Sequence, residues 1–140
     1  MKYHNCKNSN FIIDILKKNA SNSQMRKKHA SCLFKNDNIY SFGVNKYYNT
    51  KDFVLSIHAE IDALASVKKT QGMDLIVIRY EKGILKISKP CINCIEKMIK
   101  CGINKVYYSD INGDIICEYT TDIEKTHTSS GFKNIETCRI

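Results

Sequence analysis

Two short motifs, separated by 29 residues, constrain this chain more than any other feature of its sequence. The first is His58-Ala59-Glu60 and the second is Pro90-Cys91-Ile92-Asn93-Cys94. Together they supply one imidazole, two thiols and one carboxylate. Imidazole and thiolate are preferred zinc ligands, and two cysteines separated by two residues can both reach one ion. Three such ligands leave a fourth position open, so the pattern predicts a catalytic rather than a closed structural metal site.

The residues around the motifs predict that each motif opens a helix. Ser56 is a suitable N-cap, apolar residues follow it at helical spacing, and Gly72 stands where a helix is expected to stop. Pro90 suits the first position of a second helix, which we expect to end at Gly102. Because helix N-termini carry partial positive charge, this placement favours the thiolate forms of the two cysteines.

The rest of the chain alternates helical and strand-like stretches. Apolar spacing predicts a helix from Phe11 to about Asn19, and residues 46–55 are expected to form a loop before the first motif. Strands are predicted over 30–35, 39–44, 75–78, 105–109 and 115–119, with turn residues at 36–38 and 111–114 and an extended stretch at 84–88. The fully apolar run 75–78 is typical of a strand covered on both faces. We therefore expect an α/β fold, a three-layer α/β/α sandwich with a mixed sheet of about five strands, the last antiparallel.

Length and composition fit one folded domain. The 140 residues, 43% of them hydrophobic, can bury a core, and we expect a single domain over 1–140 with its core at about 11–119. Residues 1–10 form a leader and 120–140 a tail to which we assign no structure. The start is polar and no apolar run approaches the roughly 20 residues that span a bilayer, so we expect a cytoplasmic or otherwise intracellular protein without a membrane partner. Seven cysteines, an odd number, argue against a disulfide framework.

The formal charge of +8 leaves a nucleic-acid partner open. Of the 22 basic residues only Arg26, Arg79 and Arg139 are arginines. Proteins that read bases and phosphates favour arginine for its bidentate geometry. The abundance of Lys, Ile and Asn instead suggests an AT-rich coding sequence, so the charge alone does not identify a partner.

Glu60 separates a catalytic reading of the motifs from a structural one. It lies two residues from His58, so the two side chains do not share a helix face, and a proton-carrying role suits it better than ligation. Bound zinc lowers the pKa of its water to about 7. Together, this water and Glu60 can remove an amino group from a ring by hydrolysis. A structural site that recruited Cys101 would leave Glu60 unused.

On these motifs the chain resembles the cytidine deaminase-like superfamily of zinc-dependent deaminases, over roughly residues 29–119. The resemblance implies the fold expected above. It also implies that zinc is the cofactor, held by His58, Cys91 and Cys94, and that Glu60 is the general acid and base. Members of this superfamily often complete their pockets with a neighbouring subunit, which implies a homo-oligomer.

The same resemblance implies substrate contacts from Asn45 and from the backbone of Ala59. Tyr47 and Phe53, in the predicted loop, could stack on a base or simply cover the core. Tyr47 stands where nucleoside deaminases usually have glutamate, and Lys89 stands where tRNA-editing deaminases usually have glutamate. The hairpin signal at 111–114, in contrast, is similar to the nucleoside branch.

We therefore predict a zinc-dependent enzyme that deaminates a cytosine-bearing nucleoside or nucleotide to the uracil form and releases ammonia. Two alternatives stay open. One is a deaminase that edits adenosine or cytidine in RNA or DNA. The other is a catalytically silent binding module that retains the fold and the zinc.

Overall fold

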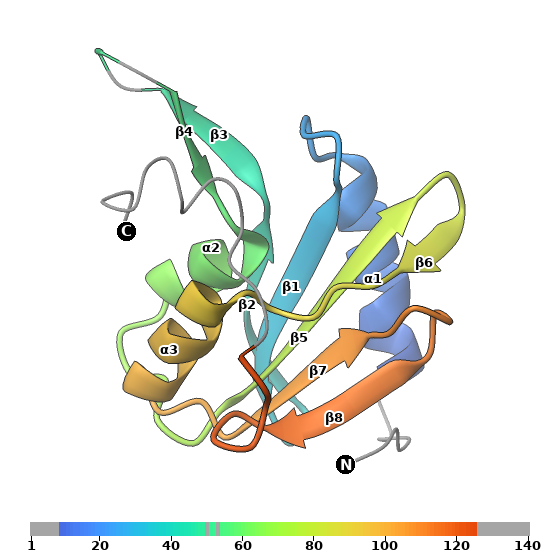
Figure 1. Cartoon of the computed structure of the whole chain (residues 1–140). Helices are drawn as coiled ribbons and strands as arrows, with labels where there is room; N and C mark the ends of the chain where they lie inside the picture. The colour runs from blue at the N-terminus through green and yellow to red at the C-terminus, as the bar shows by residue number, and fades with distance from the viewer. Residues whose placement is uncertain (1–8, 50, 53, 126–140) are drawn as a thin grey trace.

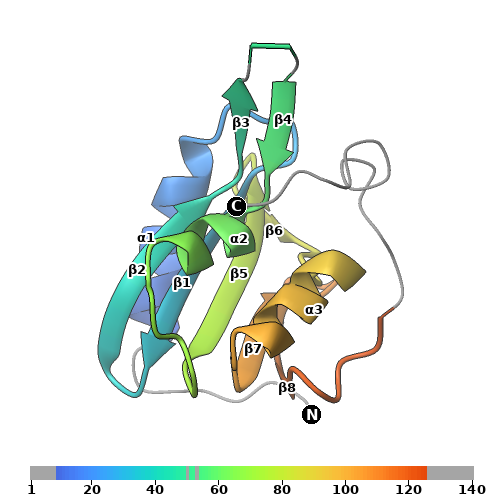
Figure 2. The same cartoon turned by 90° about the vertical axis from the view of Figure 1, so that its left-hand side faces the viewer.

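The computed structural model describes residues 9–49, 51–52 and 54–125, whose elements form three layers (Figure 1). A mixed β-sheet is the middle layer. Helix α1 covers one face of the sheet, and α2 and α3 cover the other (Figure 2). The helices are α1 (Ser9–Ser21), α2 (Ala59–Ala65) and α3 (Ile92–Lys100). The predicted α/β/α sandwich is confirmed.

The sheet has six strands in the order β2-β1-β5-β7-β8, with β6 paired to β5. The strands are β1 (His29–Lys35), β2 (Asn38–Val44), β5 (Asp74–Glu81), β6 (Ile84–Lys86), β7 (Lys105–Ser109) and β8 (Ile115–Tyr119). The pair β5–β7 is parallel, whereas the other pairs are antiparallel. The last strand is therefore antiparallel, as predicted, with Lys105 opposite Tyr119.

Alternate residues of the central strand β5 belong to two separate hydrophobic cores. Leu75 and Val77 pack into the core beneath α2 and α3. Ile76 and Ile78 pack into the core beneath α1. All four side chains are essentially buried, which confirms that the apolar run 75–78 is covered on both faces.

The prediction of a loop over residues 46–55 is wrong. The segment forms a second hairpin of β3 (Lys46–Asn49) and β4 (Val54–Ile57), which projects from the end of the main sheet (Figure 1). Its strands consist largely of aromatic and aliphatic residues, with polar residues between them. Such residues are typical of a hairpin, but each strand is only four residues long, which makes the pattern too short to recognise in the sequence.

The predicted boundaries of the helix at the first motif are also wrong. Ser56 belongs to β4, and His58 is the N-cap of α2. The helix ends at Ala65, well before Gly72, because Ser66 closes it as the C-cap. Gly72 instead has a φ of 82° and turns the chain just before β5.

At the second motif, Cys91 rather than Pro90 begins the helix. Cys91 is the N-cap of α3 with an extended backbone (φ −73°, ψ 167°), so buried Pro90 lies just outside the helix instead of at its first position. The predicted stop is confirmed, since Cys101 is the C-cap and Gly102 follows with a φ of 78°.

The ends of the described chain are better ordered than the sequence predicted. Helix α1 begins at Ser9, two residues before the expected start. In the segment after β8, the Thr120 hydroxyl donates to the Ile103 carbonyl at 2.6 Å, and Ile123 is buried in the core beneath α3. The rest of the predicted tail, 126–140, lies outside the described residues. No helix among the described residues is long and apolar enough to cross a membrane.

Candidate metal centre and active site

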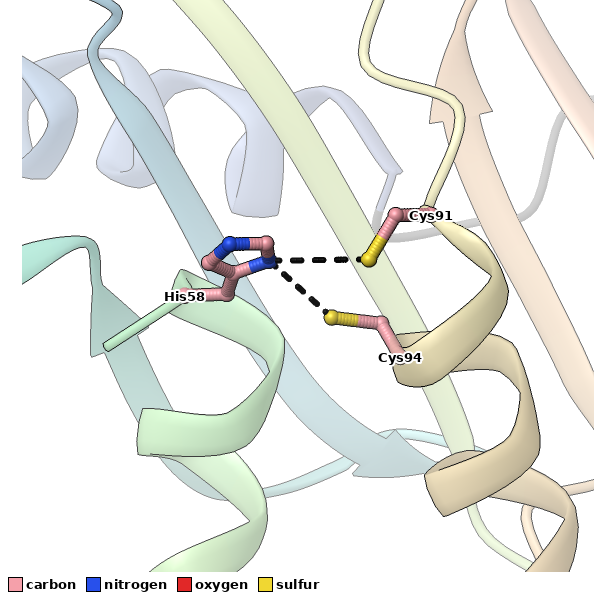
Figure 3. Close-up of side chains that lie close together, drawn as sticks. All are labelled: His58, Cys91 and Cys94. Carbon is pink, nitrogen blue, oxygen red and sulfur yellow. Dashed lines mark hydrogen bonds between the residues drawn. The ribbon is translucent and has the colours of Figure 1, made fainter. Parts of the chain in front are cut away.

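Three potential metal ligands meet where α2 and α3 begin. His58 and Cys91 are the N-caps of the two helices, and Cys94 lies in the first turn of α3 (Figure 3). His58 Nδ1 lies 3.2 Å from Cys94 Sγ and 3.8 Å from Cys91 Sγ. One ligand atom from each of the three residues falls within 4.8 Å of the others. The predicted ligand set is therefore brought together, from elements that are far apart in sequence.

The spacing of these atoms suits zinc. Zn–N bonds of about 2.0–2.1 Å and Zn–S bonds of about 2.3 Å at tetrahedral angles place nitrogen and sulfur about 3.6 Å apart. The two observed nitrogen–sulfur distances, 3.2 and 3.8 Å, bracket that value. Cys101 is the C-cap of α3, at the opposite end of the helix, so it does not join this group.

The protein environment shifts the pKa values of the three donors in different directions. A hydrogen bond from Cys94 lowers the pKa of Cys91 to about 4, so Cys91 is a thiolate at neutral pH. The same bond, together with burial, holds the pKa of Cys94 well above its ordinary value. Burial lowers the pKa of His58, but its bond to Cys91 and the charges of Glu60 and Cys91 outweigh burial, so the net pKa is raised. A metal ion must therefore displace protons to bind all three donors.

Glu60 lies in the first turn of α2 and is 5% exposed. Burial raises the pKa of Glu60, while the positive charge of His58 opposes the shift. A carboxyl group with a raised pKa can exchange protons near neutrality more readily than an exposed one. The carboxyl group thus combines a position beside the ligand set with the tuning expected of a proton carrier.

Helix α2 is fixed to the sheet by polar groups that the sequence analysis did not single out. The Ser31 hydroxyl, fully buried on β1, donates to the Ala59 carbonyl at 2.7 Å. The Ser41 hydroxyl donates to the Ala63 carbonyl at 2.8 Å, and Asp62 accepts the Val44 N–H at 3.0 Å. The only sequence signal was a hydroxyl residue on the inward-facing side of an otherwise apolar strand.

Gly43 on β2 lets α2 approach this closely. A Cβ atom at this position would lie 2.2 Å from the Ala59 carbonyl oxygen and 2.6 Å from the Ala63 nitrogen. Both of these are helix backbone atoms, so they cannot move away without displacing α2. The absence of a side chain at Gly43 therefore helps to set the position of His58.

Two buried serines fix the segment that leads into the second motif. Ser88 Oγ lies 2.9 Å from the Val77 carbonyl oxygen and 2.7 Å from Ser109 Oγ, and it accepts the Ser109 N–H at 2.8 Å. Ser109 Oγ donates to the Lys86 carbonyl at 2.6 Å. These bonds tie the approach to Cys91 to the middle of β5 and the end of β7.

The predicted substrate contacts are dispersed. Asn45 is buried, and its amide oxygen accepts the Ser23 hydroxyl at 2.7 Å and the His29 N–H at 2.9 Å, while its nitrogen donates to the Lys27 carbonyl. In this structure Asn45 thus anchors the segment before β1, and its contact with a substrate stays a prediction.

The other predicted contacts differ in their positions. Ala59 is buried at the start of α2, beside the ligand set. Tyr47 lies on β3 and is 51% exposed. Phe53 lies outside the described residues. The role of each in binding a substrate stays a prediction.

Comparisons with known proteins were consistent with this geometry. A family model described as the cytidine and deoxycytidylate deaminase zinc-binding region matches residues 7–110. The fold is similar to that of a cytidine deaminase from Burkholderia pseudomallei (21% identity, 81% of this chain and 93% of that chain, TM-score 0.62). It is also similar to the dCMP deaminase of cyanophage S-TIM5 in complex with dCMP and dUMP (19% identity, 78% and 85%, TM-score 0.59). No curated protein sequence matched.

Proposed function

Because the chain belongs to the cytidine and deoxycytidylate deaminase family, on a match that spans residues 7–110, we propose that it hydrolyses a cytosine-bearing nucleoside or nucleotide to the uracil form. Zinc is the metal of that family region, and the His-Cys-Cys group is suited to hold it. The single observation that carries the proposal is the buried carboxyl group of Glu60, two residues after His58, whose charge interacts with those of His58 and Cys91. A purely structural metal site has no use for this carboxylate.

In the proposed site, His58, Cys91 and Cys94 bind the zinc ion. Zinc bound there lowers the pKa of water and so supplies the nucleophile at neutral pH. Glu60 accepts the proton that the water gives up and passes it to the ring nitrogen next to the amino-bearing carbon. Glu60 then takes the proton of the hydroxyl group newly attached to that carbon and gives it to the departing amine. One water is consumed and one ammonia is released. The backbone of Ala59, the first residue of α2, would help to hold the base.

The test is an assay of the zinc-loaded protein with cytidine, deoxycytidine, CMP and dCMP, following the uracil product and ammonia. The matched variant is Glu60→Gln, which keeps the size of the side chain but cannot carry the proton. We expect it to retain zinc and to lose activity by about 10²- to 10⁴-fold. A variant as active as the wild type would show that Glu60 is not the proton carrier, and a zinc-loaded wild type without turnover would favour a silent zinc-retaining module.

A deaminase that acts on nucleic acid is the second candidate. The observation that favours it is the pair Tyr47 and Tyr48 on β3, which are 51% and 52% exposed on the projecting hairpin and could stack on bases. Binding of a single-stranded oligonucleotide that weakens steeply with salt, together with its deamination, would support this candidate. Oligonucleotide binding that is undetectable at low salt would remove it.

A further inference from the structure

A histidine and two cationic side chains form a row across the sheet. His29 on β1 lies opposite Arg79 on β5, and Arg79 lies opposite Lys86 on β6. Directly opposed residues on antiparallel strands project from the same face. Leu33 and Val77, at alternate positions from His29 and Arg79, pack beneath α2 and α3. The row therefore lies on the face of the sheet that carries the metal centre.

The row lies one step along the strands beyond the contact that holds the start of α2. Ser31 is opposite Val77, and its hydroxyl bonds the Ala59 carbonyl at the start of α2. His29 and Arg79 are the next positions on the same face, about 6.6 Å further along the strands. Figure 1 shows β6 and the start of β1 at the end of the sheet where α2 and α3 begin. The row thus borders the open side of the site.

Electrostatic coupling supports this proximity. Burial, with the positive charges of Arg79 and His58, lowers the pKa of His29 to about 4, so the ring is neutral at pH 7. The charge of Arg79 in the row and that of His58 in the metal centre both act on His29.

One carboxylate pairs with the two cations of the row. Glu81 Oε2 accepts Arg79 Nε at 2.7 Å, Glu81 Oε1 accepts an Arg79 terminal nitrogen at 3.3 Å, and Lys86 Nζ lies 3.5 Å from Oε1. Glu81 also accepts the Lys28 N–H at 3.0 Å. It uses two of the five N–H donors of the guanidinium, so it holds Arg79 in place while a further edge of the group stays available. Basic residues placed directly opposite one another are unfavourable unless an anion joins them.

We propose that His29, Arg79 and Lys86 bind the 5′-phosphate of the substrate, which makes it a cytosine nucleoside monophosphate rather than a free nucleoside. This inference rests on the proposed function. Arginine presents donors that match two phosphate oxygens, and Lys86 adds a point charge. One step along a strand is comparable to the span between a pyrimidine ring and the 5′-phosphate of its nucleotide. Glu81 is a positioning residue, which acts through Arg79.

The test compares dCMP with deoxycytidine on the zinc-loaded wild type and on Arg79→Gln. We expect the wild type to prefer dCMP in kcat/KM. Because charged hydrogen bonds are lost, Arg79→Gln should lower kcat/KM for dCMP by about 10- to 100-fold, mostly through KM, and leave deoxycytidine nearly unchanged. The control is Lys69→Gln, which removes an exposed lysine in the segment between α2 and β5. It should leave kcat/KM unchanged for both dCMP and deoxycytidine.

Two further variants keep the test decisive if Arg79→Gln folds poorly. Arg79→Lys retains the charge but not the two-pronged geometry, and Lys86→Gln removes a side chain that is 43% exposed. Both variants should lower kcat/KM for dCMP and not for deoxycytidine, and by less than Arg79→Gln does. Equal losses for dCMP and deoxycytidine would show that the row only fastens β6 to β5. That result, a wild type that prefers deoxycytidine, or faster deamination of a single-stranded oligonucleotide than of dCMP, would overturn the inference.

Equilibrium binding of dUMP and deoxyuridine separates this inference from the proposed function. If the protein deaminates nothing yet binds dUMP more tightly than deoxyuridine, and Arg79→Gln removes that difference, the phosphate site stands and the proposed reaction fails. If turnover occurs but the two ligands bind equally, the proposed reaction stands and the phosphate site fails.

Discussion

Glu81 forms ion pairs with both Arg79 and Lys86. Its hydrogen bonds to Arg79 lower the pKa of the Glu81 carboxyl group to about 2, and the bond from Lys28 and the charge of Lys86 act in the same direction. Both partners of the Arg79–Glu81 pair are largely buried, with side-chain exposures of 18% and 13%. The pair is therefore screened less than a surface ion pair.

Glu81→Gln should destabilise the protein in a pH-dependent way. The folded-state pKa lies below the ordinary value of 4.5, so the ionised carboxylate stabilises the fold fully above about pH 5. That stabilisation is lost as the pH falls from 4.5 towards 2. Urea unfolding at pH 7, 5 and 3 should show a wild-type advantage that is constant at the first two values and smaller at pH 3. Asp122→Asn, which removes an exposed carboxylate, is the control, and an advantage independent of pH would contradict the prediction.

At the scale of elements, the site depends on how α2 and the segment before α3 attach to the sheet. Helix α2 has only seven residues, too few to be stable alone. Its position comes from backbone contact with Gly43 and from the hydroxyls of Ser31 and Ser41. The Ser88–Ser109 pair has the same role for the segment that carries Cys91. Three ligands on two helix starts stay in register because both starts are fastened to neighbouring strands.

Gly43→Ala should destabilise the protein and weaken its zinc affinity together. The new methyl group would overlap backbone atoms of α2, so the helix must shift and carry His58 away from the two cysteines. Overpacking of this kind costs about 1–3 kcal/mol. Ser41→Ala removes one hydrogen bond to the same helix and should cost about 1 kcal/mol, with little effect on zinc. Urea unfolding and zinc competition titrations measure both effects, and unchanged zinc affinity in Gly43→Ala would refute the link.

At the scale of the whole molecule, the metal centre lies between the start of α2 and the start of α3. The first motif follows the β3–β4 hairpin and the second follows β6, so a bound ion would connect α2 to α3. Such a link stabilises the folded state by mass action, since the ligand set is not assembled in the unfolded chain. The expected homo-oligomer and the role of the chain as one domain over 1–140 stay predictions.

Removing zinc should therefore lower Tm. At a free zinc concentration 100 times the Kd, binding stabilises the fold by about 2.7 kcal/mol, and a chelator should abolish this. Cys94→Ser should lose the dependence of Tm on zinc, whereas Cys101→Ser, at the far end of α3, should keep it. Thermal unfolding across a zinc titration is the measurement. A Tm of the Cys101 variant that no longer responds to zinc would indicate a different ligand set.

The sequence by itself determined the candidate group of metal ligands, the carboxylate two residues from His58, the fully buried strand and the antiparallel last strand. Each is a local pattern: ligand spacing, an unbroken apolar run, or turn residues between two β-prone stretches. The end of α3 at Gly102 was equally local, because a left-handed backbone there favours glycine.

Only the tertiary structure decided the projecting β3–β4 hairpin, the early end of α2, the attachment through Gly43 and Ser31, and the row from His29 to Lys86. The attachment through Gly43 and Ser31 and the row from His29 to Lys86 depend on residues far apart in sequence, which the fold brings together. His29 and Arg79 are separated by 50 positions yet lie opposite one another. No periodicity in a single strand reports what its neighbour carries, so pairing across strands emerges only when the sheet forms.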